Sequence, residues 1–267
     1  MNRKIYISAD IEGTAGACTW KLEDRNSDEY HQQRNILKQE ILAAVSEINR
    51  IDSSCQITIK DAHSSGCNYD VTDFPANCEI VRGWDDGPLC MMQELDETYS
   101  AVILLGYHSC AGTDLSPLAH TFSSLRYSKV TLNGKLMSEF LISFYIAGMY
   151  QVPVVMLSGD LGICQEAEQY NAKIKTAAVQ RGRGASVISV SEEKAELLIR
   201  GALREAFGKK HHEAAQLPEY FVLDITYFSH AEANKRAYYP GCKKIDAVTV
   251  RFEHKDFREI LRALLFL

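Results

Sequence analysis

Two acidic residues stand two positions apart in Ser8-Ala9-Asp10-Ile11-Glu12-Gly13, directly after a short apolar run. The run Ile5-Tyr6-Ile7 predicts a β-strand, and side chains alternate across a strand, so Asp10 and Glu12 are expected on one face. Two carboxylates this close repel each other unless a proton or a cation neutralises them. The segment therefore predicts metal ligands at the end of the first strand. The alternative is a strand that simply runs into a polar turn.

Two histidines follow other predicted strands in the same way. His63 comes after residues 56–60, and His108 comes after the fully apolar run 101–105. Ligands of open α/β sheets bind beyond the carboxyl ends of the strands, so these side chains are expected near Asp10 and Glu12. Glu139, at the start of a predicted helix, is a possible fifth ligand.

Two histidines and three carboxylates are enough to hold a pair of divalent ions, with one carboxylate bridging them. A mixed nitrogen and oxygen set suits zinc and leaves positions open for water. His120 has no ligand partner nearby in the sequence and is a candidate acid or base. Each histidine taken singly is also compatible with a hydrogen-bonded loop residue, and Glu139 with the ordinary preference of acidic residues for helix starts.

The elements that must position these residues alternate between strands and helices along most of the chain. Apolar strands at 101–105 and 152–157 indicate a sheet that is covered on both faces. Residues 28–50 carry apolar side chains at helical spacing, Asn133-Gly134 predicts a hairpin turn, and residues 68–90 look irregular. These patterns predict an α/β fold with a mostly parallel sheet flanked by helices.

The pattern changes after residue 185, where short strands and helices no longer alternate regularly. We therefore expect a metal-binding catalytic core over residues 1–185 and a smaller C-terminal α+β domain over 186–267. The last helix is expected over 256–267, and its apolar side chains need either the core or a neighbouring subunit to cover them. The stretch Arg181-Gly182-Arg183-Gly184 is predicted to be a loop rather than a nucleic-acid contact.

Composition limits the partners of the chain. The 267 residues carry a formal net charge of −6, which argues against nucleic acid or an anionic membrane as the main partner. No apolar run approaches the roughly 18 residues that span a membrane. The eight cysteines form no Cys-x-x-Cys pair, and the N-terminus lacks the pattern of a signal peptide, so we expect reduced thiols and a cytoplasmic protein.

Five motifs, taken in order, resemble those of the zinc-dependent D-aminopeptidases of the dipeptide-transport (DppA) type, and the resemblance covers nearly the whole chain. The motifs are Ser8-Ala9-Asp10-Ile11-Glu12-Gly13, Asp61-Ala62-His63-Ser64, Leu105-Gly106-Tyr107-His108, Leu118-Ala119-His120-Thr121, and Asn133-Gly134 followed by Glu139.

The resemblance implies a two-zinc site with a defined role for each of six residues. The implied roles are Asp10 bridging both ions, Glu12 and His108 completing one ion, His63 and Glu139 completing the other, and His120 as the catalytic histidine. It also implies a ring-shaped, decamer-like homo-oligomer and short peptide substrates with an N-terminal D-residue.

Two segments depart from the family pattern and bear on substrate choice. Residues 14–24, with Cys18 and Trp20, match no motif of the family, and Gln180-Arg181-Gly182-Arg183 stands where a plainer run is expected. The predicted function is a cytoplasmic two-zinc aminopeptidase in which the free amine of the substrate is held by a carboxylate or a zinc. The alternatives are hydrolysis of another small amide, and a non-catalytic metal- and peptide-binding protein accessory to peptide uptake.

Overall fold

The structure is a computed structural model that describes residues 3–208 and 212–267, arranged around two β-sheets. The large sheet has the strand order β3-β2-β1-β4-β7-β8-β9, and all of its neighbours are parallel except β8 and β9. Its strands are β1 (Lys4–Ala9), β2 (Gln56–Asp61), β3 (Cys78–Val81), β4 (Ala101–Tyr107), β7 (Val154–Asp160), β8 (Lys175–Arg183) and β9 (Ser186–Ser189).

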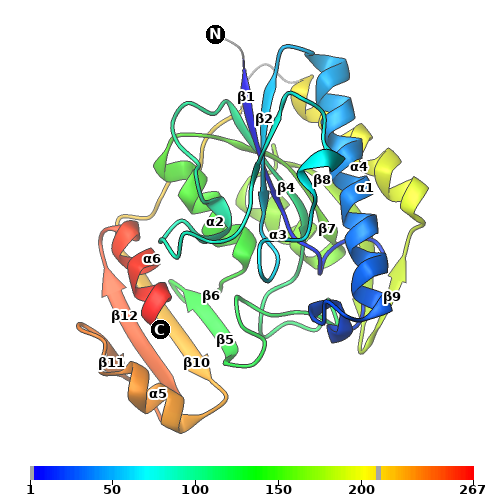
Figure 1. The fold of residues 1–267 in the computed structure, drawn as a ribbon. Helices are drawn as coiled ribbons and strands as arrows, with labels where there is room; N and C mark the ends of the chain where they lie inside the picture. The colour runs from blue at the N-terminus through cyan, green and yellow to red at the C-terminus, as the bar shows by residue number, and fades with distance from the viewer. Residues whose placement is uncertain (1–2, 209–211) are drawn as a thin grey trace.

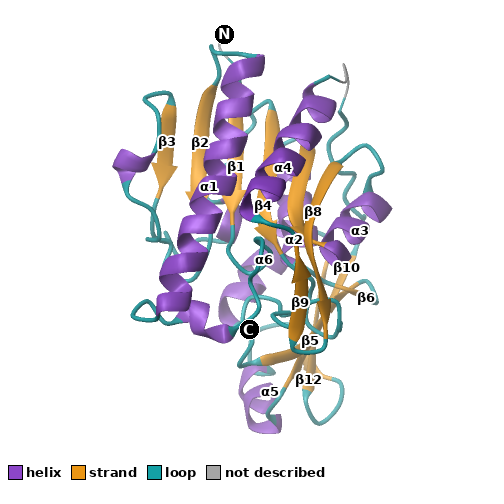
Figure 2. Ribbon diagram, turned by 90° about the vertical axis from the view of Figure 1, so that its right-hand side faces the viewer, coloured by secondary structure: helices purple, strands orange, loops and turns teal. Residues whose placement is uncertain are grey.

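Helices cover both faces of this sheet because alternate side chains of its strands are apolar on both sides. Ile5 and Ile7 of β1 pack with α1 (Asp28–Ile51) and α4 (Glu192–Phe207), which run side by side in front of the strands in Figure 2. On the opposite face, Tyr6 of β1 belongs to the apolar core shared with α2 (Glu139–Met149) and α3 (Leu161–Tyr170).

A second, antiparallel sheet lies beside the large one, at the lower left of Figure 1. Its order is β11-β12-β10-β5-β6, so a hairpin from the middle of the chain pairs with strands from the end of the chain. The elements of this layer are β5 (Tyr127–Leu132), β6 (Lys135–Leu136), β10 (Phe221–Tyr227), α5 (His230–Arg236), β11 (Lys243–Lys244), β12 (Thr249–His254) and α6 (Phe257–Phe266). The buried side of α6 packs on β10 and β12.

The predicted fold class is confirmed: a mostly parallel sheet flanked by helices is accompanied by a smaller unit of strands and helices. Three strands were not expected, one of which is the two-residue strand β11. Edge strand β3 lies within the stretch predicted to be irregular, and β8 runs through the predicted Arg181 to Arg183 loop. Gly182 pairs with Val187 of β9, and its N–H donates to the Leu115 carbonyl at 3.0 Å. A Cβ there would lie only 2.5 Å from that carbonyl oxygen, so this position of the strand requires glycine.

The two sheets do not divide the chain at residue 185. Strand β9 and helix α4 belong to the large sheet and its cover, whereas β5 and β6 belong to the second sheet. Membership of a sheet does not by itself define a folding unit, so the division into domains over 1–185 and 186–267 stays a prediction. Within the described residues, no helix is both long and apolar enough to cross a membrane.

The carboxyl ends of β1, β4 and β7 approach one another unusually closely. The backbone N–H of Asp10 donates to the Leu105 carbonyl at 2.9 Å, and the N–H of Gly13 donates to the Gly106 carbonyl at 2.8 Å. A Cβ on Gly13 would lie 1.7 Å from the Tyr107 carbonyl oxygen, and one on Gly159 would lie 2.1 Å from the same atom. Only glycine leaves room for these backbones to meet.

We predict that Gly13→Ala destabilises the fold by about 3 kcal/mol, because the added methyl group forces the ends of β1 and β4 apart. Gly201 in α4 is the matched control, since a Cβ there meets no atom within 4 Å. Gly201→Ala should stabilise the protein by about 0.5–1 kcal/mol through its higher helix propensity. Urea unfolding of both variants checks this, and equal stabilities would contradict the close packing.

Candidate metal centre

Asp10 and Glu12 lie in the turn that follows β1, not on the strand itself, because β1 ends at Ala9. Asp10 Oδ1 accepts the backbone N–H of Ile11 at 2.9 Å, and the backbone N–H of Thr14 donates to the Ile11 carbonyl at 3.1 Å. The turn brings both carboxylates to the same side, where each is only 2% exposed.

The two predicted histidine ligands follow β2 and β4, the strands on either side of β1. Both are buried. The carbonyl oxygen of His63 accepts a hydrogen bond from the Asn68 side chain at 2.8 Å, which fixes its backbone. His108 Nδ1 donates to the Ser109 carbonyl at 3.0 Å, and this leaves Nε2 with its lone pair for a ligand.

Glu139 is the first residue of α2, so the helix start delivers it to the cluster. Ser138 caps the helix, with its hydroxyl oxygen accepting the Leu141 N–H at 3.0 Å. Glu139 Oε1 accepts the backbone N–H of Phe122 at 2.7 Å, which leaves Oε2 to face His108. The cap and this hydrogen bond together hold the carboxylate in place.

All five predicted ligands meet around Asp10. Asp10 Oδ1 lies 3.5 Å from His63 Nδ1, while its other oxygen lies 3.5 Å from His108 Nε2. Glu12 Oε2 is 3.2 Å from His63 Nδ1, and Glu139 Oε2 is 3.3 Å from His108 Nε2. These distances place Glu12 beside His63 and Glu139 beside His108, whereas the family resemblance implies the opposite pairing, so the pairing stays a prediction.

His120 also reaches the cluster, from the loop between β4 and β5. Its ring stacks on His108 with centroids 4.3 Å apart and planes at 5°. Its Nε2 lies 3.9 Å from Glu12 Oε1 and 3.8 Å from Glu139 Oε1. His108, His120 and Glu139 offer donor atoms close enough to share one ion, as do Asp10, Glu12 and His63. The geometry therefore allows His120 to act either as an acid or base or as a ligand.

The electrostatics of the cluster favour positive charge. Burial raises the pKa of Asp10 well above its ordinary range, and the nearby Glu12 raises it further. Burial opposes the charged form of His63 and His108, but the adjacent carboxylates outweigh it and raise the pKa of both rings well above the usual value. Where no metal ion offsets the negative charge, the buried carboxylates therefore stabilise the protonated forms of the side chains beside them.

The residues fit a metal centre on their own chemistry. Glu12 Oε2, His63 Nε2 and His108 Nε2 are buried and have no hydrogen-bond partner. Buried polar atoms of this kind are rare in folded proteins unless an ion or water satisfies them. Carboxylate oxygens and imidazole nitrogens are ligands that zinc accepts, and five donors leave positions open on two ions.

A cavity of about 180 Å³ opens above the cluster and contains residues that the sequence did not reveal. Glu23 and Trp84 line it, and Trp20 contacts His120 edge-on with ring centroids 5.3 Å apart. Trp20 and Glu23 belong to the short 3₁₀ helix η1 (Trp20–Glu23). Neither periodicity nor a motif marks these residues. Trp20 and Glu23 lie in residues 14–24, the segment that departs from the family pattern, whereas Trp84 lies in the stretch that was expected to be irregular.

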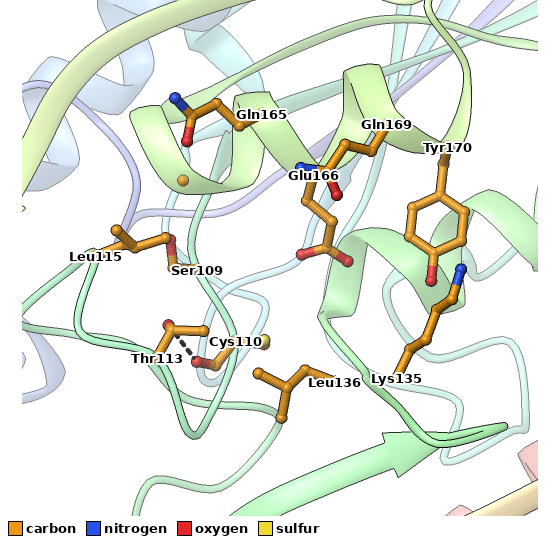
Figure 3. A pocket seen from close by; sticks show the side chains of 11 residues that line it. Ser109, Cys110, Thr113, Leu115, Lys135, Leu136, Gln165, Glu166, Gln169 and Tyr170 are labelled. Carbon is orange, nitrogen blue, oxygen red and sulfur yellow. Dashed lines mark hydrogen bonds between the residues drawn. The ribbon is translucent and has the colours of Figure 1, made fainter.

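A larger cavity of about 450 Å³ lies next to the cluster, between α3 and the hairpin of β5 and β6. In Figure 3, the Glu166 carboxylate points into this space, and Lys135 and Tyr170 lie at one end of it. Glu166 Oε1 accepts the Ser138 hydroxyl at 2.7 Å. The cavity therefore touches the helix cap that positions Glu139, although it includes none of the five ligands.

Glu40 of α1 holds the turn after Glu12 in place through a hydrogen bond to its backbone. Its Oε1 accepts the backbone N–H of Ala15 at 2.9 Å, its side chain is fully buried, and burial raises the pKa of its carboxyl to about 8. Gln33 holds the same turn, with its side-chain amide donating to Thr14 Oγ1 at 2.6 Å and to the Ala15 carbonyl at 2.9 Å.

Glu40 makes stability pH-dependent. Its pKa is about 8 in the fold against 4.5 for an ordinary glutamate, so folding takes up a proton between these values. Stability then falls by about 1.4 kcal/mol for each pH unit as pH rises through this window. Glu40→Gln keeps the acceptor for Ala15 but cannot ionise. The stability gain of the variant over wild type should grow from about pH 5 to pH 8 and then level off; a difference that is constant with pH would contradict it.

Known proteins are similar to this chain over nearly its whole length. A curated D-aminopeptidase of Bacillus subtilis (strain 168) is 29% identical over 269 residues, which cover 98% of this chain and 95% of that protein. A solved structure described as the Zn-dependent D-aminopeptidase DppA from Bacillus subtilis, a self-compartmentalizing protease, matches with a TM-score of 0.89 and 27% identity over 98% of this chain and 95% of that one.

The match extends to the family level. The family model described as D-aminopeptidase (peptidase M55) matches residues 3–266, so almost every described element lies within it. The chain belongs to the D-aminopeptidase family.

Proposed function

We propose that this chain is a two-zinc aminopeptidase that releases N-terminal residues, of the D configuration, from short peptides. The observation that carries the proposal is the convergence of four buried candidate ligands, Glu12, His63, His108 and Glu139, around Asp10, with a sixth donor, His120, stacked on His108. Zinc dependence and D-aminopeptidase activity are named for the Bacillus subtilis relatives and support the same assignment here.

Asp10 is the proposed bridge between the two ions, because its two oxygens face different histidines. Glu12, His63, His108 and Glu139 supply the remaining ligands. Two zinc ions bound there would lower the pKa of a water molecule and polarise the scissile carbonyl group. Peptide hydrolysis at a centre of this kind would use both effects together with a group that moves protons.

His120 is the proposed proton carrier. Its Nδ1 lies 2.9 Å from the Leu118 carbonyl oxygen, which can only accept, so Nδ1 donates and Nε2 is the ring nitrogen that faces the cluster. Stacking on His108 and the edge of Trp20 hold the ring on both sides. A proton accepted at Nε2 can be passed to the amine that leaves when the peptide bond breaks.

The cavity limits what reaches this centre. Its volume of about 180 Å³ lies well below the roughly 300–1,000 Å³ of pockets that enclose whole drug-sized ligands. Trp84, Met91 and Phe122 form apolar parts of its wall. Only the end of a peptide fits into such a space, which supports cleavage next to a terminus.

We predict that His120→Ala keeps its zinc and its fold but hydrolyses D-alanyl peptides at least about 100-fold more slowly, since a positioned acid or base typically contributes 10²–10⁴-fold. The control is His31→Ala, because His31 is exposed on α1 and far in sequence from the ligands. Zinc content and turnover are measured side by side in both variants and in wild type.

Each other outcome has a definite meaning. Loss of zinc from His120→Ala would make His120 a ligand, as its place beside His108 and Glu139 allows. An unchanged rate would make it structural. If wild type hydrolyses no member of a broad panel of D- and L-peptides, the chain is a metal- and peptide-binding protein instead.

A ring-shaped assembly in the cytoplasm is part of the same proposal. The solved relative is described as self-compartmentalizing. Large aromatic side chains remain exposed on the second-sheet unit, with Phe228 64%, Tyr238 83% and Phe266 55% exposed. Such residues favour an interface between subunits. Light scattering at micromolar concentration should give a mass of many subunits, and a monomeric mass would refute the ring.

The cysteines bear on the compartment. All eight are free thiols, which fits a reducing compartment such as the cytoplasm.

A further inference from the structure

Glu23 is a fourth carboxylate at the metal centre that the ligand set does not require. Its Oε1 lies 4.0 Å from His63 Nε2, and its side chain is 41% exposed. The three carboxylate ligands are at most 6% exposed. We propose that Glu23 binds the free α-ammonium group of the substrate and so makes the enzyme select peptides with an unblocked N-terminus. This inference rests on the proposed aminopeptidase function and names the group that the site recognises.

The charge of the cavity wall supports a cationic partner. Among the described residues that line this cavity, none is a lysine or an arginine. A substrate carboxylate would therefore find no cation of the protein to pair with at the wall. An ammonium group would find Glu23, whose carboxylate forms charge-assisted hydrogen bonds. The cavity is built to receive the amine end of a peptide.

Charge balance at the metal centre points the same way. Two zinc ions would carry four positive charges, against three negative charges of Asp10, Glu12 and Glu139 and one of a zinc-activated hydroxide. The ligand carboxylates would then have no surplus negative charge to pair with an ammonium group. Glu23 supplies a negative charge outside this balance, at the wall of the cavity.

Glu23 faces the cavity beside the ligand set and does not form an ion pair within hydrogen-bond range of it. Its separation of 4.0 Å from His63 Nε2 exceeds hydrogen-bond range, and the carboxylates of Asp10 and Glu12 face the other nitrogen of that ring. Its other polar neighbours are Glu12 and Ser64, neither of which is a cation. Glu23 also stands on a fixed element. Thr19 Oγ1 accepts the Lys21 N–H at 3.3 Å at the start of η1, and the Ser27 hydroxyl donates to the Lys21 carbonyl at 2.7 Å. A rigid support is what a recognition group needs.

The test compares Glu23→Gln and Glu23→Asp with Glu97→Gln, which removes the same charge from an exposed residue outside the cavity. Kinetics use D-alanyl-D-alanine, and calorimetry uses D-alanine and D-lactate, which has a hydroxyl group in place of the ammonium. Zinc content is measured in every variant.

We expect Glu23→Gln to raise KM about tenfold or more while kcat changes by less than about threefold, and to weaken D-alanine binding by a similar factor. D-lactate binding and zinc content should not change, Glu23→Asp should fall between wild type and Glu23→Gln, and Glu97→Gln should match wild type. Loss of zinc would overturn the proposal and make Glu23 a support of His63 or a ligand. Unchanged KM and D-alanine binding would also overturn it.

The outcome stays separate from that of the proposed function. If wild type hydrolyses no peptide but binds D-alanine in preference to D-lactate, and Glu23→Gln abolishes that preference, the aminopeptidase assignment fails and the role of Glu23 stands. If wild type hydrolyses peptides and Glu23→Gln leaves both KM and D-alanine binding unchanged, the aminopeptidase assignment stands and the role of Glu23 fails. A wild type that does neither contradicts both.

Discussion

The mutual repulsion of Asp10, Glu12 and Glu139 is the constraint around which the rest of this structure is arranged. Three carboxylates buried within reach of two histidines are unfavourable unless positive charge is added. The same carboxylates raise the pKa of His63 and His108, because a proton on either ring offsets part of their negative charge. A pair of divalent cations would relieve the repulsion more completely than protons do, because each ion would contribute two charges and several coordination positions.

The fold holds these charges together through backbone contacts that have no room for side chains. The ends of β1, β4 and β7 meet at the Tyr107 carbonyl, against which both Gly13 and Gly159 lie. Asp160 then accepts the N–H and hydroxyl of Ser109, both at 2.6 Å, and so fixes the residue after His108. The α/β core thus provides rigid strand ends, while the loops and α2 bring the remaining ligands to them.

The sequence predicted which side chains meet around Asp10 because each candidate ligand follows a recognisable element. The apolar run of β4 marks its own end, and with it His108; Asn133-Gly134 marks the hairpin that precedes Glu139. Strand β3 was missed because it is a short, half-exposed edge strand with no alternation, and β8 because Gly182 suggested a loop. Glu23 could not be predicted, since only tertiary folding brings η1 over His63. The interleaving of β5 and β6 with the C-terminal strands is likewise set by packing rather than by any local pattern.

We propose above that two zinc ions share Asp10, and elemental analysis tests this on the purified protein and on Asp10→Ala after equilibration with zinc and removal of the excess. We expect about two zinc ions per chain in wild type and the loss of most of the zinc in the variant, because both ions lose a ligand at once. A wild-type protein that binds no zinc, or an Asp10→Ala variant with full occupancy, would contradict it.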